Sequence, residues 1–294
     1  MNQSTNNNSL RLTLKPGTGI ILLIALMVFG LTATSFITVL LQRMSNTAAA
    51  LRIGSVIQDL LVFIIPAIAT AMLSTRLPAK FLRIDKKPDT LVCILGILIV
   101  TVAMPAINLI VEWNNSISLP ASMSHIEEVM RTLEKNAEAT VSLLMGGTSV
   151  GSLIVSVLII GFLAGFSEEI FFRGGLQRML GFAMNRHLAI FITAFIFSAI
   201  HLQFYGFFPR FLLGLLFGYL YLWSGSLAVP ALAHIYNNSM VVIVKWLMAR
   251  GAISENIDSF GAKGSGTETI AVVCSVILTA ITIYYFRKLS RKNV

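Results

Sequence analysis

One segment decides the fold of this 294-residue chain: residues 150–177, VGSLIVSVLIIGFLAGFSEEIFFRGGLQ. Its first 18 residues contain no charged side chain. An apolar run of about 18 residues is long enough for a helix to cross the hydrocarbon core of a membrane, which is roughly 30 Å thick. The run leads into Glu168 and Glu169. Because acids are costly inside hydrocarbon, their presence there indicates a functional site.

The whole chain has the composition of a membrane protein. Hydrophobic residues make up 56% of it and charged residues 12%, whereas a soluble domain has about 25% charged residues. The mean hydropathy is +0.81. We therefore predict an all-α, polytopic integral membrane bundle of about eight transmembrane helices. The apolar runs place the spans at 20–41, 53–75, 91–111, 150–177, 188–206, 208–224, 227–249 and 269–286. Alternatively, the fourth span begins near Val141 and extends past the bilayer.

The domain boundaries follow from the same pattern. Residues 1–17 are polar and predict a mobile N-terminal tail, and residues 18–290 predict one membrane domain with a motif-bearing core at about 141–250. Between the third and fourth spans, apolar residues recur at steps of three and four and predict a one-sided helix at about 121–140. This helix would lie in the membrane interface and cover the bundle, or else gate the entry of substrate. Its apolar residues are Met123, Ile126, Met130, Leu133 and Ala137.

The net charge of +9 indicates membrane topology rather than nucleic-acid binding, because Lys and Arg lie mainly in short loops between the apolar runs. With eight spans, both termini fall on one side, and that side collects 14 of the 22 basic residues. The count includes Arg173, and the loop 76–89 contributes five of the charges. Positive loops stay in the cytoplasm. We therefore predict that both termini are cytoplasmic and, in a bacterium, that the protein lies in the inner membrane.

Two pairs of polar residues lie four positions apart inside the predicted spans. Glu169 and Arg173 share a helix face in the favourable acid-first order. The arginine can therefore keep Glu169 ionised and leave Glu168 for another task. His234 and Asn238 have the same spacing and can present two hydrogen-bond donors to one point.

Three ionisable residues from different spans fall at similar depth. Counted at about 1.5 Å per residue from the predicted cytoplasmic ends, Glu168, His201 and His234 lie roughly 13, 20 and 10 Å inside. One slab in the cytoplasmic half of the membrane would therefore hold all three. A carboxylate and a histidine there could activate water while a His/Asn pair stabilises an oxyanion. Alternatively, Glu168, His201 and His234 could be three zinc ligands, with water as the fourth.

Three motifs resemble those of one known family. Glu-Glu-x-x-x-Arg spans 168–173, Phe-x-x-x-His spans 197–201 and His-x-x-x-Asn spans 234–238. In this order they resemble the motifs of the CAAX-protease and bacteriocin-processing family, also called the Abi or type II CAAX prenyl endopeptidase family. Its members are integral-membrane peptidases. The resemblance covers about residues 145–250 of this chain.

The resemblance implies a membrane endopeptidase and a role for each motif residue. Glu168 would be the general base, assisted by His201, while His234 and Asn238 would form the oxyanion site and the Glu169–Arg173 pair would support them. The substrate would be a peptide or protein, and the family name implies a lipid-modified C-terminus. Both a metal-dependent and a metal-free glutamate mechanism have been proposed for the family. Zinc therefore stays an alternative here.

Other readings of the same residues are open. Buried Glu and His also form relays in ion- or proton-coupled transporters, although the paired broken helices of such transporters are not found in this sequence. A non-catalytic immunity or scaffold protein is a third reading. Asp59 is expected to make a polar contact between helices, and the pairs Gly161/Gly165 and Gly214/Gly218 are expected to allow close helix packing.

Overall fold

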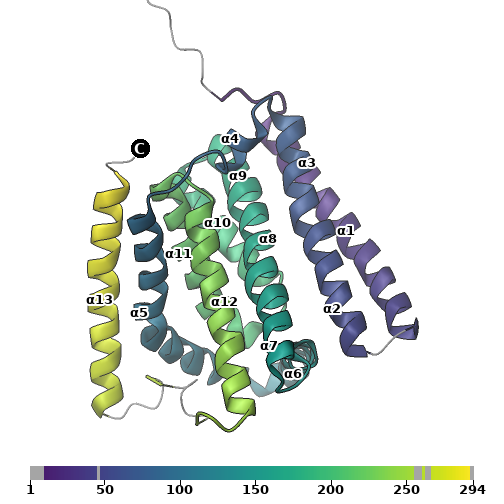
Figure 1. Cartoon of the computed structure of the whole chain (residues 1–294), viewed down its shortest axis with the longest axis vertical. Helices are drawn as coiled ribbons and strands as arrows, with labels where there is room; N and C mark the ends of the chain where they lie inside the picture. Colours follow the sequence, from purple (N-terminus) through teal and green to yellow (C-terminus); the bar gives the residue numbers. More distant parts are fainter. Residues whose placement is uncertain (1–9, 45–46, 255–259, 262–265, 292–294) are drawn as a thin grey trace, which may run out of the picture.

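A computed structural model describes residues 10–44, 47–254, 260–261 and 266–291. All regular secondary structure within these residues is helical, which confirms the predicted all-α class. Long helices stand side by side in one bundle, and the chain runs up and down it from α1 (Pro16–Met44) near one edge to α13 (Gly266–Ser290) at the other (Figure 1). The start of α1 and the end of α13 lie at the same end of the bundle (Figure 1).

The first half of the chain forms one long hairpin, a separate upright helix and a crossing helix. After α1, helix α2 (Thr47–Gln58) continues through a π-helical stretch (Asp59–Ile64) into α3 (Ile65–Ser74). Pro66, in the first turn of α3, has no backbone N–H to give to the preceding turn, which favours the wide turns before it. The chain then forms α4 (Pro78–Leu82), α5 (Thr90–Asn115), a 3-10 turn (Ala121–Met123) and α6 (Ser124–Met145).

The second half begins with one continuous helix of changing pitch. It consists of α7 (Val150–Ser156), a π-helical stretch (Val157–Ala164), α8 (Gly165–Glu169), a second π-helical stretch (Ile170–Gln177) and α9 (Arg178–Ala183). There follow α10 (Arg186–Ala199), a 3-10 turn (Phe204–Gly206), α11 (Phe207–Ser224), α12 (Ala228–Ala249) and α13. Stretches of π-helix are rare and often mark functional sites. Here two of them flank the helical turn that carries Glu168 and Glu169.

The membrane spans are largely those that the sequence predicts. In the described residues, six helices are long and apolar enough to cross a membrane: Pro16–Met44, Ala48–Ser74, Thr90–Asn115, Val150–Ala183, Phe204–Ser224 and Gly266–Ser290. The protein is therefore a polytopic integral membrane protein. The other two predicted spans correspond to α10, which has 14 residues, and to α12, which has 22 residues but contains a histidine and two asparagines. The number eight thus stays a prediction.

One predicted boundary is wrong, and one alternative start is excluded. Helix α10 ends at Ala199 rather than near 206, because Leu202 takes a left-handed conformation with φ 54° and the chain turns back. The fourth span begins at Val150 and not near Val141, which belongs to α6. Gly146 and Gly147, both with positive φ, end α6, and the Ser149 hydroxyl accepts the Ser152 N–H at 3.1 Å to start α7. The expected extension of this span as a long helix, to Ala183, is present.

Helix α6 corresponds to the one-sided helix predicted at 121–140, and it crosses the end of the bundle. Figure 1 shows it nearly end-on, so its axis crosses those of the upright helices. None of its residues is buried. The Arg52 guanidinium of α2 donates to the carbonyls of Leu144 and Met145 at 2.9 and 3.0 Å and so caps its last turn. A position in the membrane interface stays a prediction.

The N-terminal segment is partly fixed. Residues 1–9 of the predicted tail lie outside the described part of the chain. Thr13 donates its N–H to the Ser74 carbonyl at 2.8 Å and its hydroxyl to the Leu73 carbonyl at 2.7 Å. Leu10 and Leu12 pack against a buried cluster that includes Phe81 and Met179. The last residues before α1 therefore bind to the end of α3 instead of forming a free tail.

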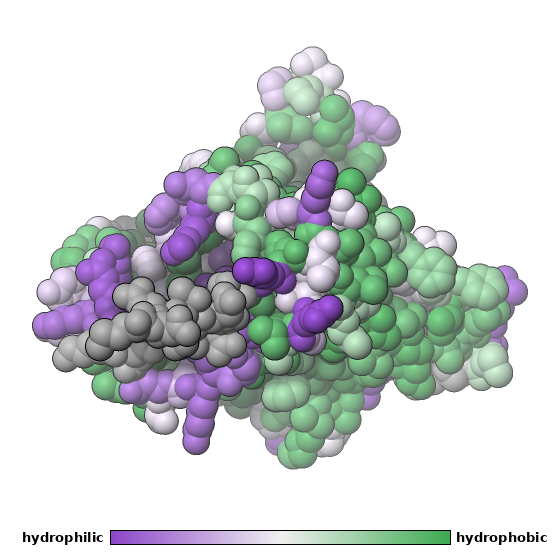
Figure 2. All heavy atoms as spheres, turned by 90° about the horizontal axis from the view of Figure 1, so that it is seen from above, coloured by the Kyte–Doolittle hydropathy of each residue, from purple (hydrophilic) through white to green (hydrophobic). Residues whose placement is uncertain are grey.

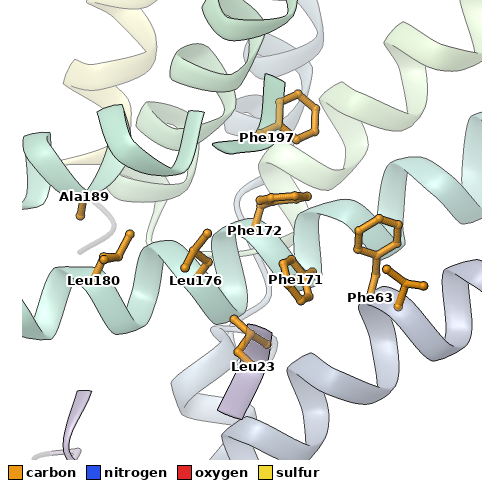
Figure 3. Close-up of a cluster of buried hydrophobic side chains, with 9 residues drawn as sticks. Leu23, Phe63, Phe171, Phe172, Leu176, Leu180, Ala189 and Phe197 are labelled. Atoms are coloured by element: carbon orange, nitrogen blue, oxygen red, sulfur yellow. The ribbon is translucent and has the colours of Figure 1, made fainter. Parts of the chain in front are cut away.

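Packing holds the segment 165–177 at the centre of the bundle. Phe171 and Phe172 meet Phe63 from the π-helical stretch after α2, and Phe172 meets Phe197 of α10 edge-on with ring centres 5.1 Å apart (Figure 3). On another face, a Cβ at Gly165 would lie 3.0 Å from the Ile235 nitrogen of α12. The predicted close packing at the glycine pairs is thus confirmed, since Gly161, Gly214 and Gly218 also abut neighbouring helices.

Candidate active site

The most deeply buried part of the site is a set of hydrogen-bonded charged groups centred on Glu169. Its carboxylate is fully buried, and one oxygen, Oε1, accepts hydrogen bonds from Arg173 at 2.7 Å and from His234 Nδ1 at 2.8 Å. The Glu169–Arg173 contact is the pair that their four-residue spacing predicts. The hydrogen bond from His234 links the continuous helix α7–α9 to α12 inside the bundle.

Arg173 is also completely buried and is held on several sides. Its second terminal nitrogen donates to the Gly214 carbonyl of α11 at 3.0 Å. Its guanidinium lies 4.9 Å from the ring centre of Phe197 and 5.4 Å from that of Phe217. A buried ion pair is tolerated only when further contacts compensate for the lost hydration. These contacts fix Glu169 and leave it little freedom to act on a substrate.

Glu168 faces a different environment. Its Oε2 lies 3.7 Å from His234 Nε2, and its side chain is 16% exposed. It lines a cavity of about 450 Å³ together with His201 and Asn238. Side chains of α1, α2 and α6 form the other walls, among them Met27, Leu31, Ser55, Val141 and Leu144. Of the two adjacent acids, Glu168 is therefore the one that opens onto a space large enough for part of a substrate.

His234 lies between the two acids. Its ring stacks on Phe217, with centres 4.7 Å apart and an angle of 18°. With the Nδ1 proton assigned to the hydrogen bond to Glu169, a neutral ring has a lone pair on Nε2, which faces Glu168. His234 can therefore donate from Nε2 only when both ring nitrogens are protonated.

His201 lies in the turn after α10 and not inside a helix. Its Nδ1 contacts the Phe197 carbonyl at 2.8 Å, and its ring packs edge-on against Phe197 at 5.3 Å. The turn is clamped by the buried Asn114 of α5, which donates to the Phe204 carbonyl at 3.1 Å and accepts the Phe208 N–H at 3.0 Å. Leu202 is held next to His201 in the left-handed conformation, and such strain often lies beside functional residues.

Asn238 lines the cavity, but its amide and the His234 ring do not direct their donors to one point. Its amide nitrogen donates to the Ile160 carbonyl at 3.3 Å, and its oxygen accepts from Asn237 at 3.2 Å. Asn238 lines the cavity, whereas His234 lies behind Glu168. A shared oxyanion site would therefore require the Asn238 amide to leave Ile160 and turn towards the substrate.

Polar contacts tie α6 to the turn that carries His201. Gln203 donates to Glu134 at 3.2 Å, and the Tyr205 hydroxyl donates to Glu127 at 3.4 Å. Burial raises the pKa of Glu134 above its ordinary value. The pKa of Glu127 is lowered, first by the hydrogen bond that it accepts from the Leu119 N–H and then by Arg131. The helix that walls the cavity is thus bound to the site mainly by polar groups.

The three candidate zinc ligands are not arranged as a metal site. His201 and His234 both engage Nδ1 and leave Nε2 free, as metal-bound histidines commonly do. Yet among the described residues no three His, Cys, Asp or Glu side chains are grouped so that they could hold a metal ion. The arrangement of Glu168, His201 and His234 therefore does not fit a three-ligand zinc centre, and no step proposed below uses a metal.

Asp59 and Arg210 also lie at the site, and the motif analysis missed them. Asp59 is 5% exposed, lines the cavity and accepts the Ser167 hydroxyl at 2.8 Å. This confirms the predicted contact between helices and places it beside Glu168. Arg210 donates to the side chain of Gln203 at 2.9 Å and lies within electrostatic reach of Glu168. The sequence did carry a signal for both residues, because each is a charged residue within an apolar run, as Glu168 is.

The comparisons with known proteins agree with the motifs. The family model described as type II CAAX prenyl endopeptidase Rce1-like matches residues 150–240. That segment runs from the start of α7 into α12 and contains all three motifs. No curated protein and no solved structure matches the chain. Over residues 150–240 this chain is therefore similar to the Rce1-like type II CAAX prenyl endopeptidases, in agreement with the resemblance that its three motifs carry.

Proposed function

We propose that this protein is an intramembrane endopeptidase in which Glu168 activates water for attack on a peptide bond. One observation carries the proposal: Glu168 opens onto the 450 Å³ cavity, while Glu169 is fully buried and bonded to Arg173 and His234. A general base must be able to reach the water whose proton it takes. Of this pair of acids, Glu168 meets that condition.

The reaction needs one water molecule and no covalent intermediate. Glu168 accepts a proton from the water as its oxygen bonds to the carbonyl carbon, and the C–N bond then breaks while the proton passes to the leaving nitrogen. His201 Nε2, which forms no hydrogen bond within the described residues, assists this transfer from the cavity wall. The direct products are a carboxylic acid and an amine, and the acid then passes its proton to the amine to give a carboxylate and an ammonium group, so that atoms and charges balance.

Two donors stabilise the tetrahedral oxyanion. They are the Asn238 amide, after it leaves the Ile160 carbonyl, and His234 with both nitrogens protonated. Glu169 and Arg173 hold the His234 ring in place. This arrangement separates the tasks of the adjacent acids: Glu168 exchanges protons, and Glu169 remains a fixed anion.

Asp59 is a positioning residue in this scheme. It does not belong to the matched segment 150–240. Its carboxylate accepts a hydrogen bond from the hydroxyl of Ser167, the residue directly before Glu168. The hydrogen bond joins the helix α2–α3 to the turn that carries the base. Asp59 therefore helps to fix the direction of the Glu168 side chain towards the cavity.

The cavity walls favour an apolar segment as substrate. Met27, Leu31, Val62 and Phe63 line one side, and Val141 and Leu144 of α6 close another. Such a surface fits an extended peptide with apolar side chains or with a lipid attached near its end. We propose a peptide or protein substrate that reaches the site from the bilayer. Comparison of a farnesylated peptide with its unmodified twin tests the need for the lipid.

Replacement of Glu168 by Gln tests the assignment. The amide has nearly the same shape as the carboxylate but cannot accept the proton, so Glu168→Gln should lower kcat by roughly 10²–10⁴-fold. Glu128→Gln is the matched control, because Glu128 lies on α6 with a side chain that is 79% exposed. Purified proteins would be incubated with both peptides, and new termini would be measured by mass spectrometry. Equal cleavage by the wild type and Glu168→Gln would reject Glu168 as the base.

A further inference from the structure

A second polar cavity lies at the end of the bundle away from α6. It has a volume of about 210 Å³ and is lined by three arginines from different elements: Arg83 after α4, Arg178 at the start of α9 and Arg186 at the start of α10. Gln177 and Tyr221 also line it. Seen from this end, hydrophilic side chains gather over part of the surface and border a broad hydrophobic flank (Figure 2).

The three arginines line the cavity without an acidic partner among the described residues. Within the described residues, none of them forms a salt bridge. Arg83 donates to the Tyr221 carbonyl at 3.0 Å and lies over the Tyr221 ring at 4.7 Å, and Arg178 lies over the ring of Phe182 at 5.1 Å. Asp85 is near enough to act on Arg178 through space, but it is exposed and makes no ion pair with it. The cavity therefore has an unbalanced positive charge.

Buried polar atoms around the cavity lack hydrogen-bond partners. Tyr221 is only 2% exposed, yet its hydroxyl has no partner in the described part of the chain, and neither do Arg178 Nε and Gln177 Oε1. A buried donor without a partner is costly, and native proteins rarely keep one. Arginines that only set membrane topology would extend their side chains into water, where water would satisfy their N–H groups. They would not leave buried donors without partners. Two of the three atoms, the tyrosine hydroxyl oxygen and Arg178 Nε, can each donate a hydrogen bond to an anion.

The local backbone also favours an anion. Arg83 is held in a left-handed conformation with φ 57°, a strain that the Leu227 N–H stabilises by donating to its carbonyl at 3.0 Å. Arg186 is the first residue of α10, a helix of 14 residues whose amino end carries partial positive charge. The start of α10 therefore adds partial positive charge beside Arg186, which lines the same cavity.

We propose that this cavity binds a phosphate group, and specifically that of an anionic phospholipid in the surrounding leaflet. Arg178 and Tyr221 would donate to the phosphate oxygens from inside, and Arg186 would do so from the rim. A volume of 210 Å³ suits a headgroup phosphate but not a whole lipid. Phe182 and Leu222 line the same cavity and offer an apolar border for the first part of an acyl chain.

The cavity is close to the catalytic residues but includes none of them. Gln177 of the cavity donates to the Gly218 carbonyl of α11 at 3.1 Å, one helical turn beyond the contact between Arg173 and the Gly214 carbonyl. A bound phosphate would therefore brace α11 against the segment 170–177. Binding can be measured on its own, so the test does not depend on the proposed peptidase activity.

Native mass spectrometry of the purified full-length protein tests the proposal. Phosphatidylglycerol, phosphatidylcholine and free inorganic phosphate would be titrated in separate arms. The variants are Arg178→Gln, Tyr221→Phe and Arg186→Gln; the last removes an exposed charge and is the least disturbing to the fold. Arg76→Gln is the matched control, since Arg76 is an exposed arginine between α3 and α4 at the same end and does not line the cavity.

The expected result is one tightly held phosphatidylglycerol per chain, with phosphatidylcholine bound more weakly. Each loss of an arginine should weaken this binding roughly fivefold or more, while Arg76→Gln should leave it unchanged. Tyr221→Phe should weaken it without any change in net charge. Strong competition by free phosphate would keep the oxyanion site but assign it to a soluble ligand. Equal binding of the two lipids, or equal effects of Arg76→Gln and Arg186→Gln, would overturn the proposal.

Discussion

Glu168 and Glu169 are adjacent, yet they lie in different surroundings because successive residues of a helix point in directions about 100° apart. Glu169 points towards Arg173 and His234 and is fully buried, whereas Glu168 lines the cavity. The sequence already indicated this division, since an arginine stands four residues after Glu169 and not after Glu168. Spacing within one helix is local information and can be read without a structure.

Asp59 could not be connected to the site in this way. Its partner Ser167 is 108 residues away in the sequence, and no periodicity relates two separate spans. Only the packing of the helix α2–α3 against α8 brings the two side chains together. The same holds for Arg210, whose link to Glu134 on α6 passes through Gln203.

A double-mutant cycle tests the role of Asp59. Asp59→Asn and Ser167→Ala should each lower kcat with little change in KM, because both loosen the same hydrogen bond behind Glu168. The double variant should then be hardly slower than either single variant, since residues that act as a unit are not additive. Thermal unfolding of the four proteins separates this effect from lost stability. Additive losses in kcat, or losses that follow the change in Tm alone, would reject a positioning role.

Metal content tests the candidate ligands Glu168, His201 and His234. Because these side chains are not grouped as a metal site, protein purified without chelator should carry much less than one zinc per chain. Activity should also survive chelation by 1,10-phenanthroline. The measurements are elemental analysis of the purified protein and the peptide assay before and after chelation. Stoichiometric zinc, with activity lost on chelation and restored by zinc, would contradict the glutamate mechanism proposed here.

At the scale of helices, hydropathy located the spans but not every end. Apolar residues such as Ile200 and Leu202 extend the hydrophobic run beyond α10, so composition alone predicted a helix to 206. The helix stops at Ala199 because the Asn114 side chain binds the backbone of residues 204 and 208 and fixes a turn there. This is a contact with a distant helix, and a pattern within 188–206 cannot reveal it.

Gly165→Ala tests how closely α8 and α12 must pack. A Cβ at Gly165 would lie 3.0 and 3.1 Å from the backbone nitrogen and Cα of Ile235, which cannot move independently of the helix. The substitution should destabilise the protein by about 1–3 kcal/mol. It should also lower activity, because Glu168 is less than one turn away and would move relative to His234. The readouts are thermal unfolding and kcat.

Gly151→Ala is the matched control, on the same continuous helix. A Cβ there would meet only the Ser149 hydroxyl at 3.9 Å, an ordinary contact. It should therefore have neutral or slightly raised stability, because Ala favours a helix more than Gly does. If Gly165→Ala behaves like Gly151→Ala, the two helices do not set the position of Glu168.

At the scale of the whole molecule, loop charge and the position of the cavity bear on the direction of access. Arg173 was counted among the charges on the side of the termini, but it is fully buried against Glu169 and carries no information on topology. The remaining charges still favour a cytoplasmic position for one end of the bundle. This end contains α4, the start of α1 and the end of α13. The catalytic cavity, however, is walled by Val141 and Leu144 of α6, at the other end.

Cysteine labelling tests from which side of the membrane the catalytic cavity is reached. In a background with Cys93 and Cys274 replaced by Ser, we place one cysteine at Arg76, in the loop before α4, or at Ile200, a cavity residue that is 37% exposed. We expect a small membrane-impermeant thiol reagent to reach position 76 only from the cytoplasm. Position 200 should react only from the opposite side, because hydrolysis needs water in the cavity and α6 borders its accessible end.

Labelling of both positions from the cytoplasm would show that the cavity opens towards the termini, as the depth of Glu168, His201 and His234 first predicted. Labelling of position 76 from outside alone would invert the topology, and protection of position 200 from both sides would contradict a hydrolase.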